Sequence, residues 1–248
     1  MSKEERKAKI KKFRQDRKLW FRNLKRVLKI KIKKPRLVFF GAKPETKSVV
    51  LSNHVGAYGP LTLEMYADFP IRMWGTHHMN TGFKELWKYL TETYYHQKKG
   101  WNIHLARLFC IVAAPLTYMF YKGLRLISTY QDHRFKATIQ ETIDVLNNNE
   151  NIVIFPEDSS QGYFDELTHF YKGFVVLCEV CFKKDMDLNI YTSYLRREDN
   201  VLIFSEPILY SELKQNFASR EEMAAHLLNQ CNDLGKIDLT LISEEQFS

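Results

Sequence analysis

Apolar residues recur at the spacing of one helical face in residues 5–32. This stretch contains no glycine or proline, and lysine and arginine fill most of the positions between the apolar residues. Pro35 ends the pattern, because proline cannot continue a helix. The pattern therefore predicts a long amphipathic helix, whose apolar stripe consists of Ile10, Phe13, Trp20, Phe21, Leu24, Val27 and Leu28.

Short runs rich in β-branched and aromatic residues follow, and they alternate with helical patterns. A helix is predicted over residues 132–146, and Ser219 and Glu222 form a capping box that opens the last helix. The alternation predicts an α/β fold with a mainly parallel central sheet flanked by helices. We expect a basic arm over residues 1–36 and an α/β domain over residues 37–248. The predicted strands are 48–52, 71–74, 124–130, 151–155, 188–194 and 201–204.

The most apolar run of the chain is residues 108–121. A helix needs roughly 20 such residues to span a bilayer, and this run is shorter. We expect a helix that is buried in the protein or dips into a membrane, with a kink where Pro115 interrupts its hydrogen bonds.

Charge is distributed unevenly along the chain. Residues 1–36 contain 17 of the 37 Lys and Arg residues but only 3 of the 29 acidic ones, so the arm is strongly positive and the remainder has a net charge of −6. A basic helix with Trp and Phe on its apolar face is typical of binding to an anionic membrane surface. The alternative is a helix whose apolar stripe packs on the body. A nucleic-acid partner is not expected, because an acidic body would repel it.

The cysteines favour a reducing compartment. Cys178 and Cys181 have the spacing of half a zinc site, but no second pair follows, and neither the adjacent His77 and His78 nor any other residues have the spacing of a metal site. No secretory signal is recognisable at the N-terminus. These patterns predict a peripheral protein on the cytoplasmic face of a membrane, with no metal and no cofactor.

Polar residues follow two of the predicted strands directly. Asn53 and His54 come after residues 48–52, while Pro156, Glu157 and Asp158 come after residues 151–155. Ligands of open α/β sheets bind beyond the carboxyl ends of strands, so these two segments are the candidate site.

These segments resemble motifs of the lysophospholipid and glycerol-phosphate acyltransferase family over roughly residues 37–235. Asn53-His54 is similar to the opening of the family's His-x-x-x-x-Asp motif, and Phe155-Pro156-Glu157 to the start of its Phe-Pro-Glu-Gly-Thr-Arg motif. Lys172-Gly173 resembles a Lys-Gly pair further along, and the segment 205–208 resembles a late Gly-x-Pro-Ile turn.

The resemblance implies transfer of an acyl chain from acyl-CoA or acyl-carrier protein to a hydroxyl of a glycerolipid-like acceptor. His54 would be the general base, because neutral imidazole accepts a proton near pH 7. Glu157 would contact an acceptor hydroxyl. The residues expected at the substrate are Asn53, Tyr58, Gly59, Pro156, Glu157, Ser159, Ser160, Lys172 and Gly173.

The chain departs from the family at the residue that orients the histidine. Gly59 stands where the family has Asp, so a substitute is required, and we expect Asp158 first and the Tyr58 hydroxyl second. The alternative is a catalytically weakened relative that binds lipid or partners without turnover.

The family's phosphate-binding arginines are also replaced. Ser159 and Ser160 stand in place of Thr-Arg, and residues 126–130 lack the arginine of the middle motif. Either Arg125, Arg134 or Lys172 replaces them, or the acceptor is not a phosphate monoester.

Overall fold

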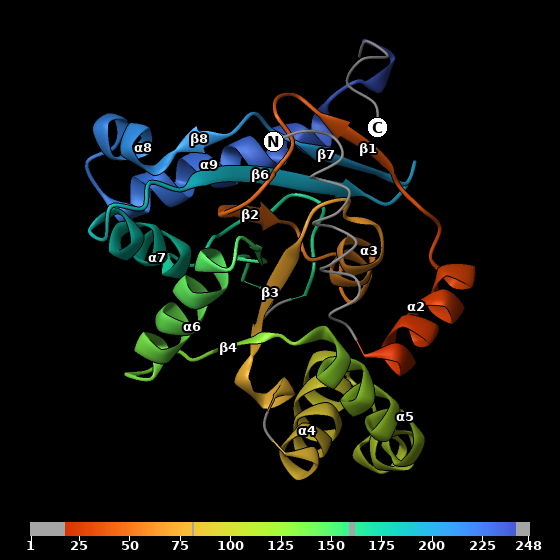
Figure 1. Ribbon diagram of the computed structural model, residues 1–248. Helices are drawn as coiled ribbons and strands as arrows, with labels where there is room; N and C mark the ends of the chain where they lie inside the picture. The colour runs from red at the N-terminus through yellow and green to blue at the C-terminus, as the bar shows by residue number, and fades with distance from the viewer. Residues whose placement is uncertain (1–17, 81, 159–161, 242–248) are drawn as a thin grey trace.

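A mixed, mostly parallel sheet forms the centre of the molecule (Figure 1). The computed structural model describes residues 18–80, 82–158 and 162–241. Within them the eight strands are β1 (Arg36–Phe39), β2 (Ser48–Ser52), β3 (Ile71–Thr76), β4 (Ile127–Thr129), β5 (Asn151–Ile154), β6 (Asn189–Arg196), β7 (Val201–Phe204) and β8 (Ile208–Leu209). The strand order is β1-β7-β6-β2-β5-β3-β4, with β8 beside β6. β6 pairs antiparallel with β7 and β8, and the other neighbours are parallel.

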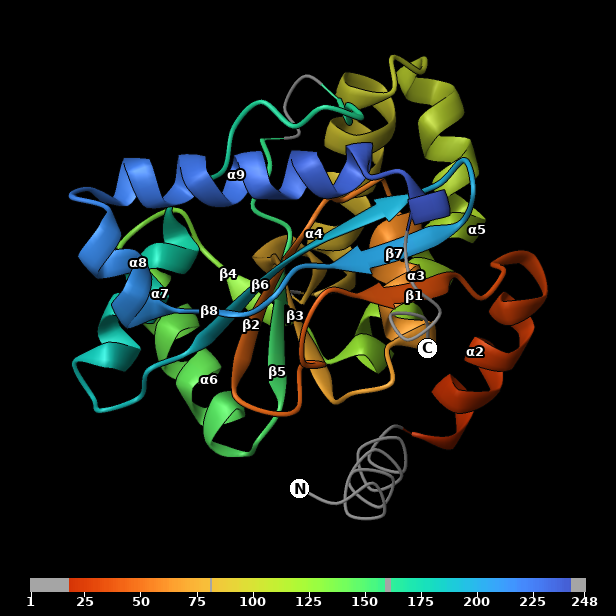
Figure 2. The ribbon, with the colours of Figure 1, turned by 90° about the horizontal axis from the view of Figure 1, so that it is seen from above.

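Helices cover both faces of this sheet (Figure 2). Alternate strand residues divide between two cores: Leu51 lies in the core shared with α6, α7, α8 and α9, and Val50 lies in the core shared with α2 and α3. The eight α-helices of the described residues are α2 (Leu19–Lys31), α3 (Tyr58–Tyr66), α4 (Phe83–Lys88), α5 (Ile103–Leu124), α6 (Phe135–Asn147), α7 (Gly173–Phe182), α8 (Tyr210–Asn216) and α9 (Arg220–Lys236).

The predicted fold class is confirmed, and all six predicted strands are present: 48–52 and 201–204 have the predicted bounds, and the other four have shifted ends. The strands β1 and β8 were not predicted. β8 has only two residues, and β1 has four and begins at Arg36, the last residue of the predicted arm, so neither gives a clear alternating pattern. The capping box is present in part: the Ser219 hydroxyl accepts the N–H of Glu222, whose carboxylate accepts the N–H of Ala218.

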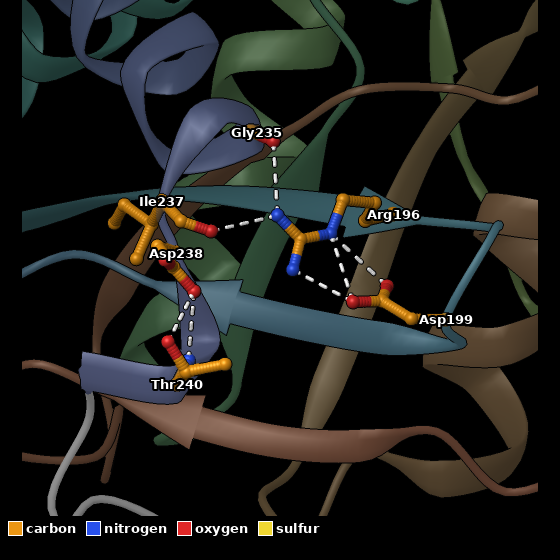
Figure 3. Close-up of polar contacts among 6 residues, drawn as sticks. All are labelled: Arg196, Asp199, Gly235, Ile237, Asp238 and Thr240. Atoms are coloured by element: carbon orange, nitrogen blue, oxygen red, sulfur yellow. Dashed lines mark hydrogen bonds and ion pairs between the residues drawn. The ribbon is translucent and has the colours of Figure 1, made fainter.

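The end of β6 is fixed by the side chain of Arg196 (Figure 3). Its guanidinium donates to both carboxylate oxygens of Asp199 and to the carbonyls of Gly235 and Ile237, at 3.2 and 2.8 Å. The network therefore joins the turn between β6 and β7 to the end of α9.

The described part of the arm packs on the body. Phe21 is fully buried, with its ring 5.5 Å from that of Phe120, and the Lys25 ammonium pairs with the buried carboxylate of Glu64 at 2.9 Å. The prediction that the whole stripe faces a membrane is therefore wrong for Phe21, while Val27 is exposed. Ile10 and Phe13 lie outside the described residues.

The apolar run predicted at residues 108–121 belongs to a longer helix. α5 spans 22 residues and continues through Pro115. It follows α4 and the π-helix η2 (Tyr89–Lys98), and it packs against both through the small buried cluster of Leu86, Leu90, Cys110 and Ala114. By length and composition alone, α5 is sufficient to cross a membrane.

Candidate functional site

The candidate site lies where β2 and β5 end side by side. These strands are parallel, and Leu51 pairs with Ile154. The same register, continued by three residues, places His54 opposite Glu157. The His54 N–H donates to Oε1 of Glu157 at 2.8 Å. The two motif segments, 103 residues apart, are thus brought together by the sheet register.

The turn after β2 orients the His54 ring. Val55 and Gly56 have φ angles of 46° and 63°, so the chain reverses sharply and the Gly56 carbonyl accepts a hydrogen bond from Nδ1 of His54. A carbonyl can only accept, so this contact assigns the proton to Nδ1 and leaves the lone pair on Nε2. Within the described part of the chain, Nε2 has no hydrogen-bond partner.

Aromatic side chains surround the same ring. The His54 ring lies 4.8 Å from that of Phe155 and 4.9 Å from that of Tyr163, centroid to centroid. Burial lowers the pKa of His54 to about 4, the Gly56 carbonyl opposes this shift, and the Lys98 ammonium adds to it. His54 is therefore neutral near pH 7, as a general base must be.

The pKa of Glu157 is shifted in the opposite direction from that of His54. Burial raises the pKa of Glu157 to about 7, and the hydrogen bond from the His54 N–H opposes the shift. A carboxyl with this pKa exists near pH 7 in both protonation states. It can therefore accept or donate a hydrogen bond to a substrate hydroxyl through the oxygen that His54 does not use.

Gly59 stands at the start of α3, directly against the histidine. Its N–H donates to the His54 carbonyl at 3.2 Å, and a Cβ atom at this position would lie 2.4 Å from that oxygen. The backbone therefore excludes an Asp at the position where the family has one. The contact that orients the imidazole comes instead from Gly56, which sequence reasoning missed because a backbone carbonyl has no sequence signature.

The two expected substitutes for the Asp have other partners. The Tyr58 hydroxyl donates to Oδ1 of Asn200 at 3.1 Å, which corrects its predicted role beside His54. The Asp158 N–H donates to the carbonyl of His169, and its carboxylate accepts from the Tyr171 hydroxyl. Asp158 is also not among the groups that shift the pKa of His54, so its catalytic role stays a prediction.

Asn53 holds the sheet together. Its amide donates to the Leu195 carbonyl at 3.0 Å and accepts from the Leu195 N–H at 2.7 Å, and the side chain is buried. Both ends of the amide are thus used by β6. Asn53 thus has a structural role, and its predicted contact with a substrate stays a prediction.

The Phe-Pro-Glu segment and the Lys-Gly segment lie together. Glu157 forms a β-bridge with Phe170, and the buried Pro156 accepts the N–H of Tyr171 at 2.8 Å. Gly173 begins α7, where a Cβ atom would lie 3.2 Å from the ring of Phe135. The two motifs therefore lie side by side, whereas Ser159 and Ser160 lie outside the described residues.

Two of the side chains expected to bind a phosphate, Lys172 and Arg134, form ion pairs with carboxylates. Lys172 pairs with Glu221 on the surface, and Arg134 pairs with Asp132 at 2.7 Å. Sequence reasoning missed Lys98, whose ammonium acts on His54 although it lies 44 positions further along the chain. No signal in a single sequence connects the two residues.

No group of three or more His, Cys, Asp and Glu side chains that could hold a metal ion occurs in the parts of the chain described above. His77 and His78 instead stack on Tyr130 and Tyr89.

Comparison with models of known protein families finds none that matches this chain, and comparison with curated protein sequences also finds no match. The acyltransferase resemblance therefore depends on the motifs and their geometry.

Proposed function

We propose that this protein is a membrane-peripheral O-acyltransferase that transfers an acyl chain from the thioester of acyl-CoA or acyl-carrier protein to a hydroxyl of a glycerolipid-like acceptor. The observation that carries the proposal is the hydrogen bond between Nδ1 of His54 and the Gly56 carbonyl. It leaves the lone pair of Nε2 for a substrate proton, beside the carboxyl of Glu157.

In the proposed reaction His54 acts first as a base and then as an acid. Nε2 of His54 takes the hydroxyl proton as the acceptor oxygen attacks the thioester carbonyl, and the C–S bond then breaks. The imidazolium returns its proton to the thiolate, so the base is regenerated. A histidine whose pKa is about 4 gives up that proton readily, because thiols have a pKa near 8.5.

The backbone carbonyl explains how the site works without the family's Asp. In serine proteases, replacing the orienting Asp by Asn lowers kcat about 10⁴-fold, because the imidazole then has the wrong tautomer. The Gly56 carbonyl keeps the productive tautomer but does not stabilise the imidazolium by charge. We therefore expect turnover that is slower than with a carboxylate but not abolished.

The acceptor's head group is proposed to face Lys98. Lys172 and Arg134 are paired with carboxylates, whereas Lys98 is exposed and acts electrostatically on His54. A single lysine is a point charge without the planar donor fork of arginine. This favours an anionic head group held loosely, for example a phosphodiester.

The proposal is tested by thiol release. The full chain is incubated with acyl-CoA or acyl-carrier protein, anionic liposomes and a panel of lysophospholipid, glycerol-phosphate and monoacylglycerol acceptors, and free thiol is measured with a chromogenic reagent. Acceptor-dependent release should fall at least 10³-fold in His54→Ala and stay unchanged in the control His133→Ala, an exposed histidine.

Absence of His54-dependent release across the whole panel would favour the second candidate, a protein of this fold that binds lipid without turnover. The observation that favours this candidate is that, among the described residues, the ring of His54 has no carboxylate as a hydrogen-bond partner: Nδ1 meets the Gly56 carbonyl, and Glu157 accepts the backbone N–H instead.

A further inference from the structure

Helix α5 presents its large side chains to the outside and its small ones to the protein. Its inward face carries Ala106, Cys110 and Ala114, all fully buried. Its outward face carries large apolar residues that are between 45% and 67% exposed: Leu105, Leu108, Phe109, Ile111, Val112, Leu116 and Met119. This is the reverse of the usual arrangement in a water-exposed helix.

These exposed residues form one continuous stripe, which we call the α5 stripe. Leu105, Leu108, Val112, Leu116 and Met119 follow one another at three or four positions, which keeps them on one side of a helix, and Phe109 and Ile111 flank this row. From Leu105 to Met119 the stripe is about 21 Å long at 1.5 Å per residue. A patch of this size on a single face marks a binding surface.

The charges around the α5 stripe are those that an anionic surface attracts. Residues 82–124 contain six Lys and Arg residues and two acidic ones, and the exposed Lys98, Lys99, Arg107 and Lys122 lie along or at the ends of α5. The neighbouring helix α2 lies on the same side of the molecule in both views, and residues 18–36 contain no acidic residue (Figures 1 and 2). Two copies of this face would therefore repel each other.

The helices η2 and α5 form a helical hairpin, and its two ends limit how deeply α5 can enter a membrane. Lys98 is the last residue of η2 and Lys99 the first of the segment that leads to α5, and both are exposed. Charged side chains resist transfer to the bilayer centre, so this end stays among the lipid head groups. The other end of α5 leads directly into β4 of the sheet. With neither end free to cross, a bilayer would have to meet α5 along its length, with the stripe facing the acyl boundary.

We infer that the α5 stripe inserts into the outer part of an anionic phospholipid bilayer and brings the His54 site to the lipid surface. The helix borders that site: the hydroxyl of Tyr121 on α5 interacts electrostatically with Tyr163, and the Tyr163 ring stacks on His54. Lys98 at the hairpin end acts on His54 as well. The inference takes from the proposed function only that the chain works at a membrane.

The first experiment is flotation of the full chain with vesicles of phosphatidylcholine alone and of phosphatidylcholine with phosphatidylglycerol. A variant with Leu108→Gln, Val112→Gln and Leu116→Gln should bind the anionic vesicles at least tenfold more weakly than the native chain. The contrasting variant changes the exposed apolar residues of α2, Leu19, Val27 and Ile30, to Gln. Its binding to the anionic vesicles should be weakened less than that of the α5 variant. An equal or greater loss of binding would overturn the inference.

The second experiment places a probe on the stripe itself. An environment-sensitive fluorophore is attached to Val112→Cys or, as the matched control, to the exposed Asn229→Cys on α9; the four native cysteines are buried and do not compete. On anionic vesicles the probe at position 112 should shift to the blue and be quenched by brominated lipid, and the probe at 229 should not. A probe at 112 that stays in water on bound chains would refute the inference.

Two further outcomes separate the possible causes of failure. A native dimer in sedimentation that dissociates in the α5 variant would assign the stripe to a second copy of the chain and overturn the inference. His54-dependent turnover of a water-soluble acceptor is measured in parallel. Vesicle insertion without turnover would leave this inference standing and count against the proposed function, whereas turnover without insertion would do the reverse.

Discussion

The backbone N–H of His54 donates a 2.8 Å hydrogen bond to Oε1 of Glu157. The bond joins the ends of two neighbouring parallel strands, and both partners titrate away from their ordinary pKa values. The pKa of His54 is lowered to about 4 and that of Glu157 is raised to about 7, each mainly by burial. These shifts make the stability of the fold depend on pH in two opposite ways.

Replacing Glu157 by Gln should make the protein relatively more stable as pH rises. In the native chain, folding favours the protonated carboxyl between pH 4.5 and about 7, so stability is present below pH 4.5 and is lost as pH rises through 7. The variant lacks this loss, which amounts to about 3 kcal/mol at most for a shift of this size. Urea unfolding of both proteins from pH 4 to 8 measures it. A constant difference across that range would contradict the prediction.

Replacing His54 by Asn should have the opposite effect on the pH profile. In the native chain the neutral ring is favoured in the fold, so stability is present above pH 6.5 and is lost as pH falls through about 4. The free energy of unfolding of the variant should therefore rise relative to that of the native chain as pH falls over this window. The same histidine is the proposed base, so its pKa should also appear in the pH dependence of kcat/KM. On the acid side, kcat/KM should fall only well below pH 6.5. A fall centred at pH 6.5 would show that the ring is not desolvated.

Restoring the family's acidic residue at Gly59 should impair the protein instead of improving it. A Cβ atom at residue 59 would lie 2.4 Å from the His54 carbonyl oxygen, so both Gly59→Ala and Gly59→Asp must displace the turn. We expect a loss of about 1–3 kcal/mol in the free energy of unfolding, with lower turnover. Ala57→Asp, an exposed neighbour, is the control and should stay within about 0.5 kcal/mol. Higher turnover in Gly59→Asp would refute the orienting role given to Gly56.

The packing of the arm predicts the effect of a change at Gly123. A Cβ atom there would lie 2.0 Å from Cδ2 of Phe21, which is fully buried. Gly123→Ala should therefore loosen α2 and make its lysines and arginines more sensitive to trypsin. Lys122→Ala, at the exposed neighbouring position, should leave the cleavage rate unchanged. Equal rates for all three proteins would mean that α2 does not depend on this contact.

Several features could be predicted from the sequence because they depend on local patterns. The strand at residues 48–52 has the predicted bounds, since a short β-branched run between polar residues has few other structures open to it. The His-bearing and Glu-bearing segments were predicted as one site, because the carboxyl ends of parallel strands share an edge. The basic arm was likewise predicted by composition and spacing alone.

Other features were decided only by the tertiary structure. Which group orients His54 depends on a left-handed turn that brings the Gly56 carbonyl to Nδ1, and a backbone oxygen carries no residue identity. The role of Asn53 depends on the register of β6, which supplies Leu195. Phe21 and Val27 share one predicted stripe, yet the surfaces available for packing bury the first and expose the second.

The sequence by itself thus determined the fold class, six of the eight described strands, the approximate site and the charge of the arm, because these follow from local periodicity and composition. The tertiary structure alone decided which polar groups meet, how far burial shifts the pKa of His54 and Glu157, and which apolar face stays exposed. Those outcomes depend on contacts between residues far apart in the chain, and spacing along a single sequence carries no information about them.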